Sequence, residues 1–153
     1  MSAYDCRFCH GLKQYRQMLE EAASSSGTAG LVVADLPASI AVLSPDQYYR
    51  GYTIVMAKTH ATELFHLPDP ESTQFVHDMR EVAEAVATAF SPRKMNYELL
   101  GNTVPHLHWH VVPRYDWDRN PTRPIWEHSH DPVFLATEEY EEIAARISAQ
   151  LRR

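Results

Sequence analysis

Three histidines alternate with apolar residues in one short segment of the chain. His106, His108 and His110 are separated by Leu107 and Trp109. Alternate side chains of a β-strand point to the same face, so these imidazoles would share a face at spacings of roughly 6.5–7 Å. Imidazole titrates near neutral pH and serves as a nucleophile, a proton carrier or a metal ligand. The spacing therefore predicts a reaction centre or a metal site on one face of a strand.

Three interpretations of this segment stay open on the residues alone. The histidines could form the polar outer side of an exposed edge strand. They could be the three ligands of a catalytic zinc ion with an open fourth position, although His106 and His110 would lie about 13 Å apart along the backbone. In the third interpretation, His108 attacks phosphorus to form a phosphoramidate, and its two neighbours stabilise the phosphoryl oxygens.

A second group of candidate residues lies near the N-terminus. Cys6 and Cys9 form a C-x-x-C motif, which is compatible with a redox dithiol, half of a zinc site, or two unconnected thiols. The surrounding sequence shows no strong strand–helix pattern of the thioredoxin type. A zinc site needs two further nitrogen or sulfur ligands, for which His10, His60 and His106 are candidates.

The elements that must position these residues are short strands and separate helices. Apolar periodicity and turn residues predict strands at 31–36, 39–44, 52–57, 94–100 and 106–114. The same patterns predict helices at 11–23, 71–90 and 137–151. Prolines make 116–132 a long irregular loop. Paired strands with separate helices indicate an α+β fold in a single domain, residues 1–153.

Composition narrows the classes of partner. The 153 residues are 44% hydrophobic, which is enough for one packed core. A formal net charge of −6 argues against a nucleic acid polymer as partner, whereas a small anion needs only a local group of donors. The chain has neither a membrane-spanning apolar run nor a signal-peptide-like start. These observations predict a cytoplasmic protein with reduced thiols and no membrane partner.

The histidine segment also carries a family resemblance. Leu100–Arg114 resembles the signature of the histidine triad (HIT) family, in particular its bacterial diadenosine tetraphosphate hydrolase-like branch. Residues 51–55 and 58–60 resemble the same family, and the match covers roughly residues 5–115. The C-terminal loop and helix, 116–153, contribute little to it. The resemblance implies a HIT-like α+β fold, in which an antiparallel sheet carries a long helix and flanking helices, and a homodimer.

The resemblance assigns roles to two histidines. His108 would be the nucleophile that attacks the α-phosphorus, and His110 would contact the α-phosphate or the leaving group. Water would then hydrolyse the nucleotidyl–histidine and release a nucleoside monophosphate. The implied activity is a nucleotide hydrolase or nucleotidyl transferase acting on dinucleoside polyphosphates or phosphoramidates. The alternative is a nucleotide-binding regulatory module with little catalysis.

The resemblance further implies a set of substrate-binding residues. They are Gly101, Asn102 and Thr103 in the turn before the histidines, Asn96 on the adjacent strand, and Ser44. Two positions depart from better-known branches of the family. Tyr52 stands where many members have histidine, and Ser44 stands where an acidic or amide residue often faces the ribose. Both departures bear on ribose recognition and on the choice of substrate.

In the zinc-containing part of the family, the resemblance also implies a metal site. Its four ligands here would be Cys6, Cys9, His60 and His106. Four protein ligands make a closed, structural site. Such a site would attach the N-terminus to the sheet and leave His108 and His110 for the reaction.

Overall fold

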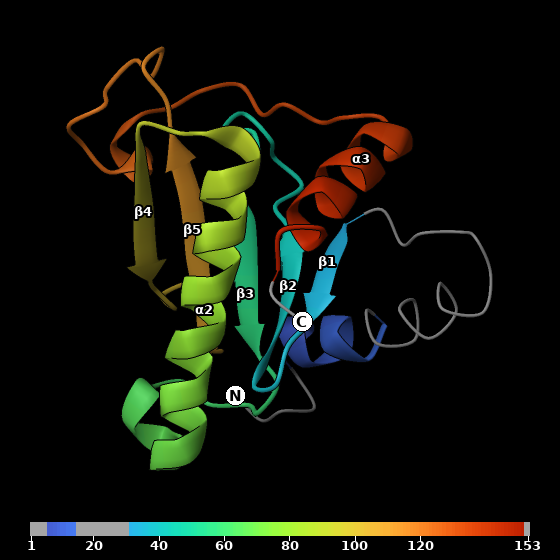
Figure 1. Ribbon diagram of the computed structural model, residues 1–153. Helices are drawn as coiled ribbons and strands as arrows, with labels where there is room; N and C mark the ends of the chain where they lie inside the picture. Colours follow the sequence, from blue (N-terminus) through green and yellow to red (C-terminus); the bar gives the residue numbers. More distant parts are fainter. Residues whose placement is uncertain (1–5, 15–30, 152–153) are drawn as a thin grey trace.

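The computed structural model describes residues 6–14 and 31–151, and its centre is a five-stranded antiparallel sheet with the order β1-β2-β3-β5-β4 (Figure 1). The strands are β1 (Val32–Asp35), β2 (Ser39–Leu43), β3 (Thr53–Ala57), β4 (Lys94–Leu99) and β5 (His108–Arg114). The central position of β3 and β5 places the histidine segment in the middle of the sheet.

Helices α2 (Asp69–Phe90) and α3 (Thr137–Ser148) pack on one face of this sheet (Figure 1). Pro70 lies in the first turn of α2, where its missing N–H costs no hydrogen bond. The helix ends at Phe90, and its C-cap residue Ser91, just before Pro92, has a left-handed backbone. Two short 3-10 helices, Leu64–His66 and Ile125–Glu127, lie in the connections.

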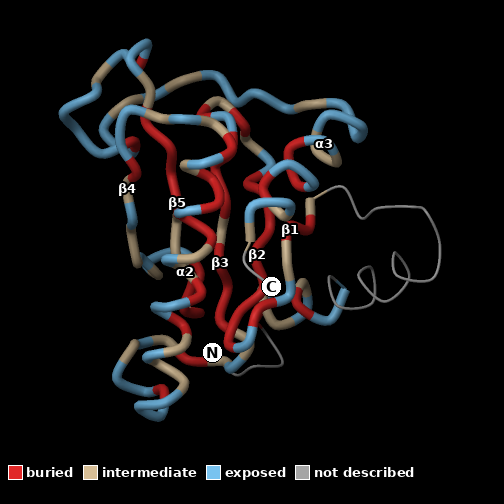
Figure 2. Tube along the Cα trace, viewed as in Figure 1, coloured by how far each residue is buried: buried red, intermediate tan, exposed pale blue. Residues whose placement is uncertain are grey.

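Both faces of the central strands are covered. On the α2 side, buried residues of α2 pack against Val55 of β3 and Val111 of β5. On the opposite side, residues 7–14 are helical, and Leu12 packs with Val42 and Met56. All five residues of β2 are buried, and most residues of β3 and β5 are buried as well, as the tube in Figure 2 shows. This double burial explains why Ile40–Leu43 form an apolar run without polar alternation.

The turn before β3 depends on a close approach between two elements. Gly51 has a φ of +92°, and a Cβ at this position would lie 2.8 Å from the ring of Phe90 at the end of α2. Glycine adopts this left-handed conformation without the steric cost that other residues carry. The turn thus brings the chain from β2 into β3 directly beneath the helix end.

The predicted α+β fold with an antiparallel sheet and a long helix is confirmed, whereas several element bounds differ. The long helix begins at Asp69 rather than at residue 71. The helical segment begins at residue 7 rather than 11, and the rest of the helix predicted at 11–23 lies outside the described residues.

The strand predicted at 106–114 begins at His108, so the prediction that one strand carries all three histidines is wrong for His106. The N–H of His106 donates to the carbonyl of Val104, which turns the backbone away from the ladder. Among the described helices, none has both the length and the apolar character that a bilayer crossing needs.

Candidate active site and metal site

Strand β5 presents His108 and His110 on the sheet face opposite α2. His108 pairs with Met56 and His110 pairs with Ile54, so these four side chains share one face. Trp109, between them, points to the other face, where its ring lies 6.0 Å from that of Phe75 in α2. The two imidazoles meet edge to face with centroids 4.8 Å apart.

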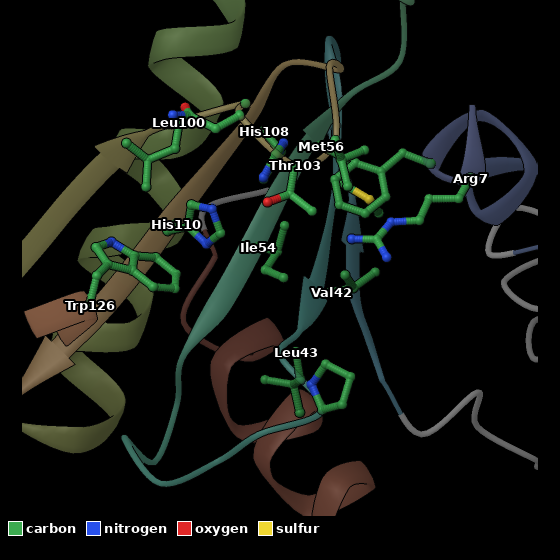
Figure 3. A pocket seen from close by; sticks show the side chains of 15 residues that line it. Arg7, Val42, Leu43, Ile54, Met56, Leu100, Thr103, His108, His110 and Trp126 are labelled. Atoms are coloured by element: carbon green, nitrogen blue, oxygen red, sulfur yellow. The ribbon is translucent and has the colours of Figure 1, made fainter. Parts of the chain in front are cut away.

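The two histidines open into a cavity of about 660 Å³, here called the histidine cavity (Figure 3). Its apolar wall comes from Phe8 and from sheet residues that include Val42, Ile54 and Met56. Its polar rim is formed by the turn 101–103 and by a guanidinium. The residues of that rim are Arg7, Gly101, Asn102 and Thr103. The predicted binding turn is therefore beside His108.

The backbone fixes which nitrogen of His108 carries the proton. His108 Nδ1 lies 2.6 Å from the carbonyl oxygen of His106. A carbonyl can only accept, so Nδ1 carries the hydrogen and Nε2 keeps its lone pair. Burial lowers the pKa of His108, and the nearby Arg7 cation lowers it further, whereas the hydrogen bond to His106 opposes both. His108 is therefore a neutral imidazole with a nucleophilic Nε2.

His110 has a different partner. Its Nδ1 lies 2.5 Å from the phenol oxygen of Tyr52, which precedes β3 and is 8% exposed. Burial, together with the neighbouring His108, lowers the pKa of His110 to about 4. The ring of Trp126 meets that of His110 edge to face at 5.1 Å. His110 is thus a second neutral imidazole, enclosed by two aromatic side chains.

His106 lies apart from this pair and belongs to a metal-type cluster. Its Nε2 lies 2.8 Å from the carbonyl oxygen of Ala57, so Nε2 is the donor and Nδ1 has the lone pair. This Nδ1 lies 3.5 Å from the Sγ atoms of both Cys6 and Cys9 and 3.2 Å from His60 Nδ1. A backbone acceptor behind the ligating imidazole is the usual support of a metal ligand.

The dimensions of the cluster fit a tetrahedral ion. The four ligand atoms lie within 4.8 Å of one another, and Cys9 Sγ is 3.4 Å from His60 Nδ1. With zinc–nitrogen bonds of about 2.0–2.1 Å and zinc–sulfur bonds of about 2.3 Å, a tetrahedral ion places two nitrogen ligands about 3.3 Å apart. It places a nitrogen and a sulfur ligand about 3.6 Å apart. Burial and the neighbouring Cys6 raise the pKa of the Cys9 thiol to about 11, so the thiol keeps its proton near neutral pH and a bound cation would have to displace it.

Other predicted residues lie outside the histidine cavity. Asn96 shares the sheet face of His110, but its partner on β5 is Val112, two residues further along. Its amide oxygen accepts a hydrogen bond from Arg114 Nη1 at 2.7 Å, and it lines a separate hollow of about 280 Å³. Asn96 therefore lines this neighbouring hollow rather than the histidine cavity, and its role in substrate binding stays a prediction. Ser44 is buried, and the lining of the cavity contains its neighbours Leu43 and Pro45 instead.

Arg114 is a structural residue. It is 4% exposed, its Nε donates to Asp118 at 2.6 Å, and its other nitrogens donate to the carbonyls of Asn120 and Arg123. Its donors hold the loop after β5 in place.

Sequence reasoning missed three residues of the site. Arg7 was treated only as a spacer between the cysteines, although it reaches the cavity rim (Figure 3). Trp126 lies in the irregular segment 116–132, whose path the sequence does not predict. Its indole N–H donates to Glu98 on β4. Tyr52 was noted only as a departure from the family pattern. Its contact with His110 depends on the β3–β5 register, which places Tyr52 two residues before Ile54, the strand partner of His110, and no sequence signal gives that register.

Comparison with known proteins identifies the family of this chain. The family model described as the HIT domain matches residues 28–117, more than half of the chain. The chain belongs to the HIT family. A crystal structure of a HIT protein from Sinorhizobium meliloti superimposes with a TM-score of 0.71 and 27% identity, over 79% of this chain and 89% of that one.

Two mycobacterial relatives extend the comparison. An AP-4-A phosphorylase from Mycobacterium tuberculosis is 31% identical over 110 residues. These residues are 68% of this chain, but the match spans only 56% of the phosphorylase. The crystal structure of a Zn-bound histidine triad family protein from Mycobacterium smegmatis has a TM-score of 0.62 at 22% identity, over 97% of this chain and 94% of that one. That similarity shows the shared fold.

Proposed function

We propose that this HIT protein is a nucleotide hydrolase or nucleotidyl transferase that forms a covalent nucleotidyl–histidine on His108. One observation carries the proposal. The hydrogen bond from His108 Nδ1 to the backbone leaves the Nε2 lone pair available beside a cavity large enough for a nucleotide. Such an arrangement supplies an activated nucleophile without a separate general base.

The reaction divides into two displacements at the α-phosphorus. His108 Nε2 forms a bond to phosphorus, and the bond from phosphorus to the leaving group breaks with its electron pair going to the leaving group. Water then attacks the same phosphorus, the P–N bond breaks, and the pair returns to Nε2. The water loses a proton to solvent, and a nucleoside monophosphate is released. Another acceptor in place of water would make the reaction a transfer.

The cavity lining supports a nucleotide as substrate. The apolar wall of Phe8, Val42 and Met56 suits a base, while the turn 101–103 and Arg7 offer donors to phosphate oxygens. Arg7 matters because the chain as a whole is acidic, with a formal charge of −6, and attraction of an anion must therefore be local. The mycobacterial relative named AP-4-A phosphorylase supports dinucleoside polyphosphates as a first substrate class, with nucleoside phosphoramidates as a second.

Zinc is the proposed occupant of the cysteine–histidine cluster. Cys6, Cys9, His60 and His106 would hold it, as the cluster dimensions and the Zn-bound relative from Mycobacterium smegmatis support. When bound, the ion would cross-link the N-terminal segment to the chain before β5 and would have no open position for substrate. Its contribution to the reaction would be the placement of His108, two residues after His106.

Substitution of the nucleophile tests the proposal. His108→Ala should lower monophosphate release from a dinucleoside tetraphosphate by at least about 10³-fold, because no other group supplies the attacking lone pair. His77→Ala, on the exposed side of α2, is the matched control and should keep the wild-type rate. Thermal unfolding should show that both variants are folded. A His108→Ala variant with most of its activity would refute the mechanism.

The same assay separates the regulatory alternative. A module that only binds nucleotides would show affinity in calorimetry but no monophosphate from polyphosphates or phosphoramidates. The homodimer implied by the family resemblance remains a separate proposal, which light scattering of the purified chain would check.

A further inference from the structure

The phenol of Tyr52 touches the second histidine of the reaction pair. We propose that Tyr52 is a positioning residue that holds His110 as a neutral Nε2–H donor, and that this pair selects leaving groups able to depart without a proton. The preferred substrates would then be nucleoside polyphosphates rather than nucleoside phosphoramidates. The inference rests on the proposed function, because it concerns the fate of the leaving group in that reaction.

The contact follows from the strand register. Ile54 of β3 pairs directly with His110 of β5, so Tyr52, two residues earlier, lies on the same face and diagonal to His110. The phenol oxygen reaches His110 Nδ1 at 2.5 Å. The Tyr52 ring is buried in a cluster with Tyr49, Val112 and Ile125, so it has little room to turn away.

The direction of the hydrogen bond follows from the other partners. Within the described part of the chain, Tyr52 Oη has His110 Nδ1 as its hydrogen-bond partner and no second acceptor. If His110 Nδ1 were the donor, the buried phenol hydrogen would be left without an acceptor among the described residues, which is unfavourable for a buried polar group. If Tyr52 donates, one bond satisfies both groups. The His110 hydrogen is then on Nε2.

The two adjacent imidazoles consequently have opposite tautomers. His108 has its hydrogen on Nδ1 and a lone pair on Nε2, whereas His110 has a lone pair on Nδ1 and its hydrogen on Nε2. One ring can attack phosphorus while the other donates a hydrogen bond to an oxygen that gains charge. The backbone sets the first tautomer and a side chain sets the second.

The Tyr52–His110 pair does not readily transfer a proton to the leaving group. A neutral His110 that lost its Nε2 hydrogen would have to take the Tyr52 proton on Nδ1 and leave a buried phenolate. Burial, and then the nearby carboxylates of Glu98 and Asp46, raise the pKa of Tyr52, which opposes that step. A polyphosphate leaves as a stable anion and needs only the hydrogen bond. An amine leaving group needs a proton as the P–N bond breaks, and this pair does not supply it.

The test compares Tyr52→Phe and Tyr52→His with the matched control Tyr49→Phe, which removes a hydroxyl from the same buried cluster. Nitrogen-15 spectra of the imidazoles in the full-length protein should show His110 protonated on Nε2 in the wild type. Tyr52→Phe should shift it toward a mixture of tautomers. For a dinucleoside tetraphosphate, Tyr52→Phe should lower kcat about tenfold or more and leave KM within about twofold, because the lost contact acts on the leaving group.

Tyr52→His should restore the polyphosphate rate and raise the rate with a nucleoside phosphoramidate above the wild-type rate, since imidazole titrates near neutrality. Tyr49→Phe should leave the spectra and both rates unchanged. A His110 proton found on Nδ1, or an unchanged kcat in Tyr52→Phe, would overturn the inference. A wild-type protein with the expected tautomer but no turnover of any nucleotide would instead overturn the proposed function, and the selectivity with it.

Discussion

Loss of the proposed zinc ion should weaken the fold, and it should lower activity only through that loss of structure. Cys9→Ser removes one of four ligands and releases the constraint on the helical residues 7–14. Their main anchor is Leu12, which is 6% exposed, with the partly buried Phe8 beside it. A fully buried apolar side chain contributes about 1.5–3 kcal/mol, so release of this segment should cost about 2–4 kcal/mol. That is a large share of the ~5–15 kcal/mol that stabilises a domain.

The assay is thermal unfolding combined with metal analysis. For a chain of about this size, each kcal/mol moves Tm by about 2–4 °C, so Cys9→Ser should lower Tm by about 4–16 °C. Its metal content should fall well below one ion per chain. His10→Ala is the matched control, because His10 is an exposed neighbour of Cys9 outside the cluster. It should keep both the metal and the wild-type Tm.

The order of events under chelation gives the decisive result. With a structural ion, activity should decline together with Tm as a chelator removes the metal. A rapid loss of activity at unchanged Tm would refute this reasoning and would favour a catalytic metal held by the histidines. An unchanged Tm in Cys9→Ser would refute the estimated contribution of the cysteine–histidine cluster to the free energy of unfolding.

Three further outcomes follow from the site and the turn that leads into it. Gly51→Ala should lower the free energy of unfolding in urea by about 2 kcal/mol, because the φ of +92° and the 2.8 Å approach to Phe90 disfavour a Cβ; an unchanged midpoint would contradict this. Arg7→Met should raise KM for a dinucleoside tetraphosphate about fivefold, equivalent to ~1 kcal/mol for an exposed cation, whereas Lys13→Met should not. The pKa of His110 in the folded protein is about 4, below the usual 6.5. Between these two pH values only the unfolded protein binds a proton at His110, so the free energy of unfolding falls as the pH drops through this window. The wild type should lose about 1–2 kcal/mol more than His110→Asn between pH 6.5 and 4, after allowance for partial exposure of the ring, and equal losses would contradict the assignment.

Local periodicity was sufficient to predict the central features of the site. Alternation in β5 placed His108 and His110 on one face because strand geometry depends on neighbouring residues alone. The same rule failed at His106, where a hydrogen bond to Val104 turns the backbone out of the ladder. Family resemblance, rather than periodicity, brought Cys6 and His60 together with His106, since they are distant in the sequence.

The sequence alone could not predict the positions of residues that depend on pairing between distant segments. The position of Asn96 depends on the β4–β5 register and on Arg114, whose partner Asp118 belongs to an irregular loop. Tyr52 contacts His110 only because β3 pairs with β5. Trp126 reaches His110 from a loop whose path no periodic pattern describes.

Trapping of the covalent intermediate on His108 would test the proposed mechanism directly. The protein would be mixed with a dinucleoside tetraphosphate, quenched at alkaline pH within the first turnover, digested and sequenced by tandem mass spectrometry. A nucleoside monophosphate adduct is expected on the imidazole of His108 in the wild type, and none in His108→Ala. An adduct on another residue, or monophosphate release with no adduct at any quench time, would contradict it.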